Sequence, residues 1–147
     1  MIKKILLAVD GSATSRKAVD YAMDVAKGLG SEVIILSVID EALMRSYMNL
    51  VALDPMDISE PIEERMKKAA EANAKEAKNL FKERGIPAQI SIRSGHPAEE
   101  IVSEAETVKA DMIIMGSHGK TSLSIIGGVT FGVIHRDTEI PVLVVRK

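Results

Sequence analysis

The chain has 147 residues, of which 46% are hydrophobic, a net charge of −2 at pH 7 and no cysteine. A chain of this length buries about two thirds of its unfolded surface in one domain, so we expect residues 1–147 to form a single domain. A pI near 5.9 and an aromatic content of only 3% argue against a nucleic-acid partner, which normally requires a basic surface or stacking platforms. The absence of cysteine excludes disulfides, thiol catalysis and thiolate metal sites, and agrees with a cytoplasmic location.

Hydrophobic periodicity predicts strands and helices in alternation. The segment Ile2–Val9 is apolar and β-branched, which predicts a first strand. Its apolar run ends at Asp10, too early for a signal peptide or a membrane span, so no membrane partner is expected. Ser12 is placed to cap a helix that Gly30 ends, and Glu32–Ile39 predicts a second buried strand.

An eighteen-residue connection, Asp40 to Asp57, follows the second strand and contains three of the eight methionines. Connections of this length are usually functional or mobile. Two interpretations stay open: a flap whose methionines pack on the sheet edge, or a ligand lid or adaptable partner surface. Beyond it, Ser59 is the expected cap of a long helix that extends to Arg84 and is closed by Gly85.

The second half of the chain continues the alternation. Apolar and polar side chains alternate over Ala88–Arg93, which predicts a half-exposed strand at a sheet edge. The remaining elements are expected to be a helix from Pro97 to about Val108, a fourth strand over Asp111–Met115, a partly helical segment over Ser122–His135 and a fifth strand over Ile140–Val145. Strands separated by helices predict an α/β fold with a parallel sheet and right-handed crossovers.

The most distinctive segment is Met115–Thr130, read MGSHGKTSLSIIGGVT, in which a Gly-x-x-Gly turn follows an apolar strand. Backbone N–H groups at such glycines can cradle a phosphate. Gly119-Lys120-Thr121 has the ending of a P-loop, but a P-loop requires a glycine five residues before Gly119. That position is Ile114, inside the expected strand, so a P-loop is excluded.

The expected fold also predicts a ligand site at the glycine turn after the fourth strand. In a doubly wound sheet of order 3-2-1-4-5 the chain reverses direction between strands one and four, and ligands bind beyond the carboxyl ends of those strands. In this chain the two ends carry Asp10-Gly11-Ser12 and Gly116-Ser117-His118-Gly119. The two arguments therefore predict one crevice.

Several segments resemble the universal stress protein family: KKILLAVDGS, LSVID, SGHPAEEI, MGSHGKTSL, GGVT and the ending PVLVVR. The resemblance covers nearly the whole chain and is closest to the ATP-binding subgroup. It implies the adenine nucleotide alpha hydrolase-like fold, a doubly wound five-stranded parallel sheet of order 3-2-1-4-5 with helices on both faces. It also implies a bound adenine nucleotide (ATP, or AMP or ADP) that carries Mg²⁺, and a homodimer formed through the C-terminal strand, residues 140–146.

The resemblance also implies which residues contact the nucleotide. Asp10, with Ala8 and Val9 beside it, would lie against ribose and adenine, and Val38 would hold the adenine edge through its backbone. The residues implied for ribose and phosphates are Met115, Gly116, His118, Gly119, Gly127, Gly128, Val129 and Thr130. Without the resemblance, Asp10 is equally suited to cap the helix that follows it.

Two features depart from the family's nucleotide signature, which is Gly-x-x-Gly, nine residues, and then Gly followed by Ser or Thr. Only seven residues separate Gly119 from Gly127, and Gly128 replaces the hydroxyl residue. Thr121 or Thr130 can supply a substitute hydroxyl. Two functions stay open: an adenine-nucleotide module that acts as a stress-response switch or sensor, and a stress-response homodimer that binds no ATP and acts through protein contacts.

Other activities are less compatible with the sequence. No residue is recognisable as a base for water attack, so we expect no enzyme activity beyond slow incidental ATP hydrolysis. A phospho-receiver of similar topology needs an aspartate after strand three, where this chain has Arg93-Ser94-Gly95. The histidines, His96, His118 and His135, lack metal-ligand spacing, so no metal site formed by protein side chains is expected.

Overall fold

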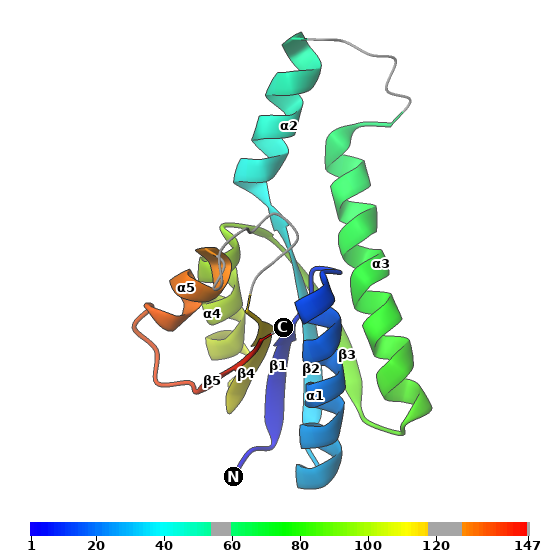
Figure 1. The fold of residues 1–147 in the computed structure, drawn as a ribbon, viewed down its shortest axis with the longest axis vertical. Coiled ribbons are helices and arrows are strands. Elements are labelled where there is room, and N and C mark those ends of the chain that lie inside the picture. Colours follow the sequence, from blue (N-terminus) through cyan, green and yellow to red (C-terminus); the bar gives the residue numbers. More distant parts are fainter. Residues whose placement is uncertain (54–59, 118–127, 147) are drawn as a thin grey trace.

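The computed structural model describes residues 1–53, 60–117 and 128–146. Its five strands form one parallel sheet of order β3-β2-β1-β4-β5, with helices on both faces (Figure 1). In chain order the elements are β1 (Lys4–Ala8), α1 (Ala13–Leu29), β2 (Glu32–Asp40), α2 (Glu41–Leu53), α3 (Ile62–Glu83), β3 (Ala88–Gly95), α4 (Pro97–Thr107), β4 (Met112–Gly116), α5 (Gly128–Ile134) and β5 (Val142–Val145). The predicted fold class and strand order are confirmed.

Two apolar layers hold the helices on the sheet. Because side chains alternate along a strand, Ile5 and Leu7 of β1 pack toward α1 and α3, whereas Leu6 packs toward α4 and α5. The helix α3 approaches the sheet closely because its buried stripe consists mainly of alanines and ends in the fully buried Phe81. Each face of the sheet is therefore covered by its own pair of helices.

The helix ends follow local chemistry, with one correction. Ser12 caps α1 as predicted: its Oγ accepts a hydrogen bond from Ser15 N at 3.2 Å, and Gly30 ends the helix in the left-handed conformation, with φ of 67°. The prediction that Ser59 caps α3 is wrong, because the cap position is Pro61, which makes no side-chain cap bond. The ring of Pro61 holds φ near −58°, close to a helical value, so the chain enters α3 at this residue without a capping hydroxyl.

Most of the connection between β2 and α3 is the helix α2, which the periodicity analysis did not predict. It follows β2 directly because Asp40 caps it, with Oδ1 accepting from the backbone N–H groups of Ala42 at 3.1 Å and Leu43 at 3.2 Å. Figure 1 shows α2 rising beyond the carboxyl end of the sheet, beside the first turns of α3. None of the residues of α2 is buried.

The two edge strands differ in character. The strand β3 is half-exposed, as predicted, and runs two residues further, to Gly95. The strand β5 begins at Val142 rather than Ile140, and its first three residues are half-buried. Of the predicted partly helical segment, residues 128–134 form α5, and residues 122–127 lie outside the described ranges.

Candidate functional site

A cavity of about 700 Å³ lies at the carboxyl ends of β1, β2 and β4. Nine of the twelve predicted nucleotide contacts line it: Ala8, Val9, Asp10, Val38, Met115, Gly116, Gly128, Val129 and Thr130. The other three, His118, Gly119 and Gly127, lie outside the described residues. The predicted switch point is therefore a cavity in the size range of small-molecule sites.

The turn between β1 and α1 places a carboxylate at the mouth of this cavity. Asp10 is exposed, and its Oδ1 accepts a hydrogen bond from Ser12 N at 2.9 Å. Its own backbone N–H donates to Ser15 Oγ at 3.1 Å. The Oδ2 atom has no hydrogen-bond partner within the described ranges. Asp10 therefore shapes the turn with one oxygen and leaves the other open at the cavity.

Gly116 is required by packing at the end of β4. A Cβ at this position would lie 2.5 Å from Thr14 Oγ1 and 2.8 to 2.9 Å from backbone atoms of Thr14 and Ser15. From the other side, Thr130 Oγ1 donates to the Gly116 carbonyl at 2.9 Å. The Thr130 hydroxyl proton is thus engaged inside the protein, which leaves only its lone pairs for a ligand.

The backbone of Val38 faces the cavity without a partner strand. Leu36 O accepts from Val9 N at 2.9 Å, so even-numbered residues of β2 turn their backbone groups toward β1. The register between the two strands ends at the pair Ala8 and Leu36. Val38 lies two residues further, and no hydrogen bond joins it to β1 in the part of the chain that is described. One N–H donor and one C=O acceptor are therefore left open side by side.

The charged groups in the lining of the cavity are acidic. Among the described residues, Asp10 and Asp40 are its only charged members, and Asp40 Oδ1 is engaged as the cap of α2. No group of three or more potential metal ligands occurs in the described ranges. The cavity can therefore donate and accept hydrogen bonds, but these side chains offer no positive charge to a phosphate.

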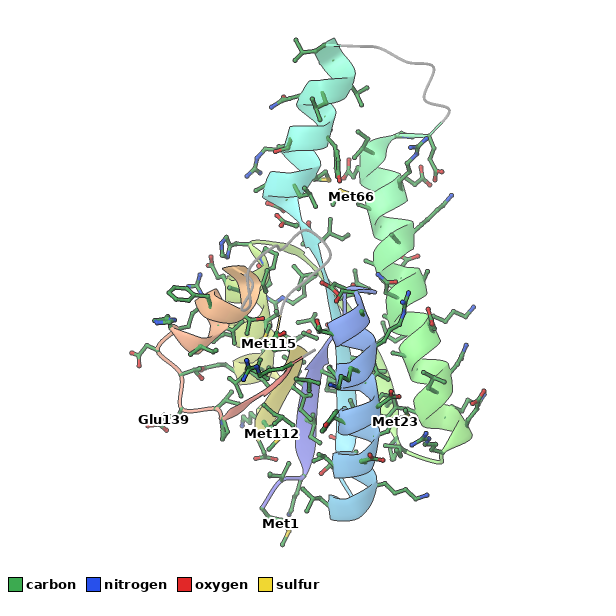
Figure 2. The ribbon with its side chains drawn as sticks, in the orientation of Figure 1. Met1, Met23, Met66, Met112, Met115 and Glu139 are labelled. Carbon is green, nitrogen blue, oxygen red and sulfur yellow. The ribbon has the colours of Figure 1, made fainter. Side chains whose placement is uncertain are left out.

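One wall of the cavity was missed by sequence reasoning. It comes from α2 and α3 and consists of Leu43, Met66, Ala69, Ala70 and Asn73. Figure 2 shows Met66 pointing from α3 toward α2, away from Met115 at the end of β4. Further lining residues that were not predicted are Ser12, Ser15, Leu36, Ser37, Ile39, Asp40, Pro97 and Ile101. The sequence marks two of the unpredicted lining residues as unusual. Ser37 is a polar residue within an apolar strand, and Asn73 is a polar residue within a stripe of alanines.

None of the helices in the described ranges is long and apolar enough to span a membrane. The model of the universal stress protein family matches residues 1–146. The protein MJ0531 of Methanocaldococcus jannaschii is 36% identical over 149 residues, which cover 100% of this chain and 84% of MJ0531. The protein YxiE of Bacillus subtilis is 34% identical over 99% of this chain and 100% of its own length.

Solved structures agree with the sequence relatives. The structure of MJ0577 from M. jannaschii superposes with a TM-score of 0.83 at 34% identity, covering 100% of this chain and 97% of MJ0577. Two universal stress proteins that share the fold were solved with nucleotides: one from Archaeoglobus fulgidus with dAMP (TM-score 0.70, 17% identity, 99% of this chain and 98% of that one) and one with cAMP (TM-score 0.58, 23% identity, 99% and 97%). By the family match and by relatives above 30% identity along its whole length, this chain belongs to the universal stress protein family.

Proposed function

We propose that the protein binds an adenine nucleotide in the cavity at the carboxyl ends of β1, β2 and β4, and acts as a nucleotide-dependent switch or sensor in a stress response. The observation that carries this proposal is the open backbone of Val38, next to the Asp10 carboxylate on the neighbouring strand end. A fixed donor and acceptor pair suits a heterocyclic base, and a carboxylate suits sugar hydroxyls.

The base edge selects adenine. Adenine presents an acceptor at N1 beside a donor at N6, which matches the N–H and C=O of Val38. Guanine presents the reverse, a donor at N1 beside an acceptor at O6. Backbone groups in a strand cannot exchange places. With guanine, the Val38 N–H would therefore face the N1 donor and the Val38 C=O would face the O6 acceptor, which is costly. We expect adenine nucleotides to bind much more tightly than guanine nucleotides.

The sugar and phosphates extend from this base position toward β4. Asp10 Oδ2 accepts from a ribose hydroxyl, and the phosphates pass Gly116 and Gly128, where an added Cβ at Gly128 would meet no atom within 4 Å. Since the described lining holds no cationic side chain, Mg²⁺ carried by the nucleotide offsets the phosphate charge. ATP, ADP and AMP all fit this arrangement. The dAMP and cAMP complexes of two fold neighbours support it, because there the same fold holds an adenine nucleotide.

Calorimetry with Mg-ATP tests the proposal. We expect a dissociation constant in the micromolar range, about −8 kcal/mol, and binding of Mg-GTP at least about tenfold weaker. Mass spectrometry of small molecules released from the purified protein identifies which nucleotide is carried. An absence of both heat and thermal shift at millimolar Mg-ATP, with correctly folded protein, would overturn nucleotide binding.

We propose binding without significant turnover. The described cavity holds Asp10 as an exposed carboxylate, but it is placed for the sugar, and no arginine lines the cavity to stabilise a transferring phosphoryl group. Bound ATP should stay mostly intact for many minutes. Steady phosphate release at several per second from homogeneous protein would instead identify an enzyme.

A homodimer through β5 is the second proposal, and it holds with or without a nucleotide. Ile113 N donates to Pro141 O and Ser117 N donates to Val145 O, both at 2.8 Å, so odd-numbered residues of β5 bond to β4. The backbone groups of Val142 and Val144 therefore point to the free edge, where a second β5 strand can pair about a two-fold axis.

The edge geometry gives a clean test of assembly. Val144→Pro removes a donor on the free edge and leaves the bonds to β4 in place, so it should give a folded monomer. Val144→Thr keeps the N–H group and should stay dimeric. Light scattering at micromolar concentration measures both, and a monomeric parent would refute the dimer.

A further inference from the structure

The cavity continues past the predicted nucleotide contacts, into the space between β2 and α3. Along β2, side chains alternate, and Ile35 belongs to the layer under α1 and α3, so Ser37 faces that layer too. Ser37 lines the cavity and is only 3% exposed. Its hydroxyl has no hydrogen-bond partner in the ranges that the structure describes. The hydroxyl of this buried residue is therefore open to the cavity.

A second unpaired polar side chain comes from α3. Asn73 lies three residues after Ala70 and four before Ala77, both buried, so it belongs to the stripe of α3 that faces the sheet. It also lines the cavity and lies against Gly11, where an added Cβ would be 2.7 Å from Asn73 Oδ1. Its amide makes no hydrogen bond with any described residue. Its donors and acceptor are therefore available beside the Asp10 turn.

Two unpaired polar groups in one apolar wall need an explanation. The rest of this wall is apolar, formed by Leu43, Met66, Ala69 and Ala70. Neither group has a hydrogen-bond partner among the described residues, so each can pair with a molecule that enters the cavity. A few polar groups that converge in a mainly apolar wall are typical of a ligand site.

The geometry points to a polar subsite in which Ser37 and Asn73 hydrogen-bond the purine base of the bound nucleotide on the side that faces α3. This inference rests on the proposed function, because it takes the base to lie against Val38, the neighbour of Ser37 in the strand. With the N1 edge on the Val38 backbone, the base still has ring nitrogens N3 and N7 and the second N6 hydrogen without partners. An amide and a hydroxyl match these groups, and bidentate pairing of asparagine with adenine N6 and N7 is well known.

The decisive variant is Ser37→Ala, because affinity should fall without a loss of stability. The Ser37 hydroxyl bonds no described residue, so its removal should leave the Tm of the nucleotide-free protein unchanged to within about 1 °C. The same change should weaken adenine-nucleotide binding by about threefold to tenfold, the value of one hydrogen bond. The matched control is Ser31→Ala, which is equally buried but has a hydroxyl that donates to Ile2 O at 2.5 Å. It should lower the Tm and leave binding unchanged.

A second set of measurements identifies the base as the group contacted. Asn73→Ala and Ser37→Ala should weaken the binding of adenosine, AMP and Mg-ATP by the same factor, because adenosine carries the base without phosphates. Asn73→Ala should lose its effect on 7-deaza-ATP if the amide bonds N7, and should keep it if the amide bonds N3. Both results support a base contact.

The outcomes separate this inference from the proposed function. If the parent protein binds neither adenosine nor Mg-ATP, the proposed function fails and the subsite with it. If the parent binds Mg-ATP but both variants bind it as tightly as the parent, only the subsite is overturned. A Ser37→Ala protein with a lowered Tm, or variants that affect Mg-ATP but not adenosine, would overturn it as well.

Discussion

The two ends of the parallel sheet treat their polar groups in opposite ways. At the amino end, Asp111 Oδ2 accepts from Lys3 N at 2.9 Å and Lys4 N at 3.0 Å, and the buried Ser31 hydroxyl donates to Ile2 O. At the carboxyl end, the Ser37 hydroxyl and the Asn73 amide have no partner among the described residues, although both line the cavity. At the amino end these polar groups are paired within the protein, whereas at the carboxyl end Ser37 and Asn73 remain able to bond a ligand.

This difference separates stability from function. Paired groups at the amino end hold the strands in register and leave nothing for a ligand. Unpaired groups at the carboxyl end add no internal hydrogen bond to the empty protein and can gain partners when a ligand enters. Changes at the amino end should therefore alter stability alone, and changes at the carboxyl end should alter binding, with or without a stability effect.

The largest effect is expected at Gly116, because a change there should alter both stability and nucleotide binding. Gly116→Ala forces a Cβ against Thr14 and Ser15, including their backbone atoms, which cannot move aside cheaply. It should lower the free energy of unfolding by about 1–3 kcal/mol and abolish nucleotide binding, because the end of β4 shifts in the cavity. Urea denaturation and calorimetry measure the two effects.

Gly128 provides the control for this change. It also lines the cavity, but an added Cβ there meets no atom within 4 Å. Gly128→Ala should leave the free energy of unfolding unchanged or slightly higher, since alanine suits a helix better than glycine. Equal stability of the two variants would contradict the close packing of Gly116 against α1.

An intermediate effect is expected at Asp10. Asp10→Ala removes the oxygen proposed for ribose and should weaken nucleotide binding by about 1.5–3 kcal/mol. Asp40→Ala is its counterpart on β2: it removes the cap of α2 and should reduce stability by about 1 kcal/mol with a smaller loss of binding. If calorimetry ranks the two losses of affinity in the reverse order, the sugar lies at β2 and the ligand orientation proposed here is wrong.

The smallest effect is expected at the amino end. Backbone hydrogen bonds from Lys3 and Lys4 lower the pKa of Asp111, so the folded state favours its carboxylate. The stability that this group contributes is present above the ordinary carboxyl pKa and is lost as pH falls through its lowered folded-state pKa. Asp111→Asn should lower the Tm slightly at pH 7 and match the parent at strongly acidic pH. Its affinity for nucleotide should not change, and a weakened affinity would mean that the two ends are coupled.

Local patterns along the chain predicted the five strands and the helices between them, with the exception of α2. The strand order was implied by the family resemblance, and the switch point follows from that order. Ser12 and Gly30 mark the ends of α1 through capping chemistry that involves only their immediate neighbours. The nine predicted contacts that line the cavity came from the resemblance to the family's motifs, and they lie at strand ends and in α5. The same local signals failed at Ser59, and they did not predict α2, because the cap at Asp40 stands inside what reads as the end of a strand.

Only the tertiary structure decided which polar groups are satisfied. Ser31, just before β2, and Ser37, within β2, are both buried serines, yet one hydroxyl reaches a carbonyl 29 residues away in the chain and the other reaches none among the described residues. The open backbone of Val38 depends on where β1 stops pairing, and the position of Asn73 depends on how α3 crosses the Asp10 turn. Hydrogen-bond satisfaction is a property of neighbours in space, and those neighbours come from distant parts of the chain. For this reason the family and the location of the cavity were predictable from the sequence, and the α3 wall with its unpaired groups was not.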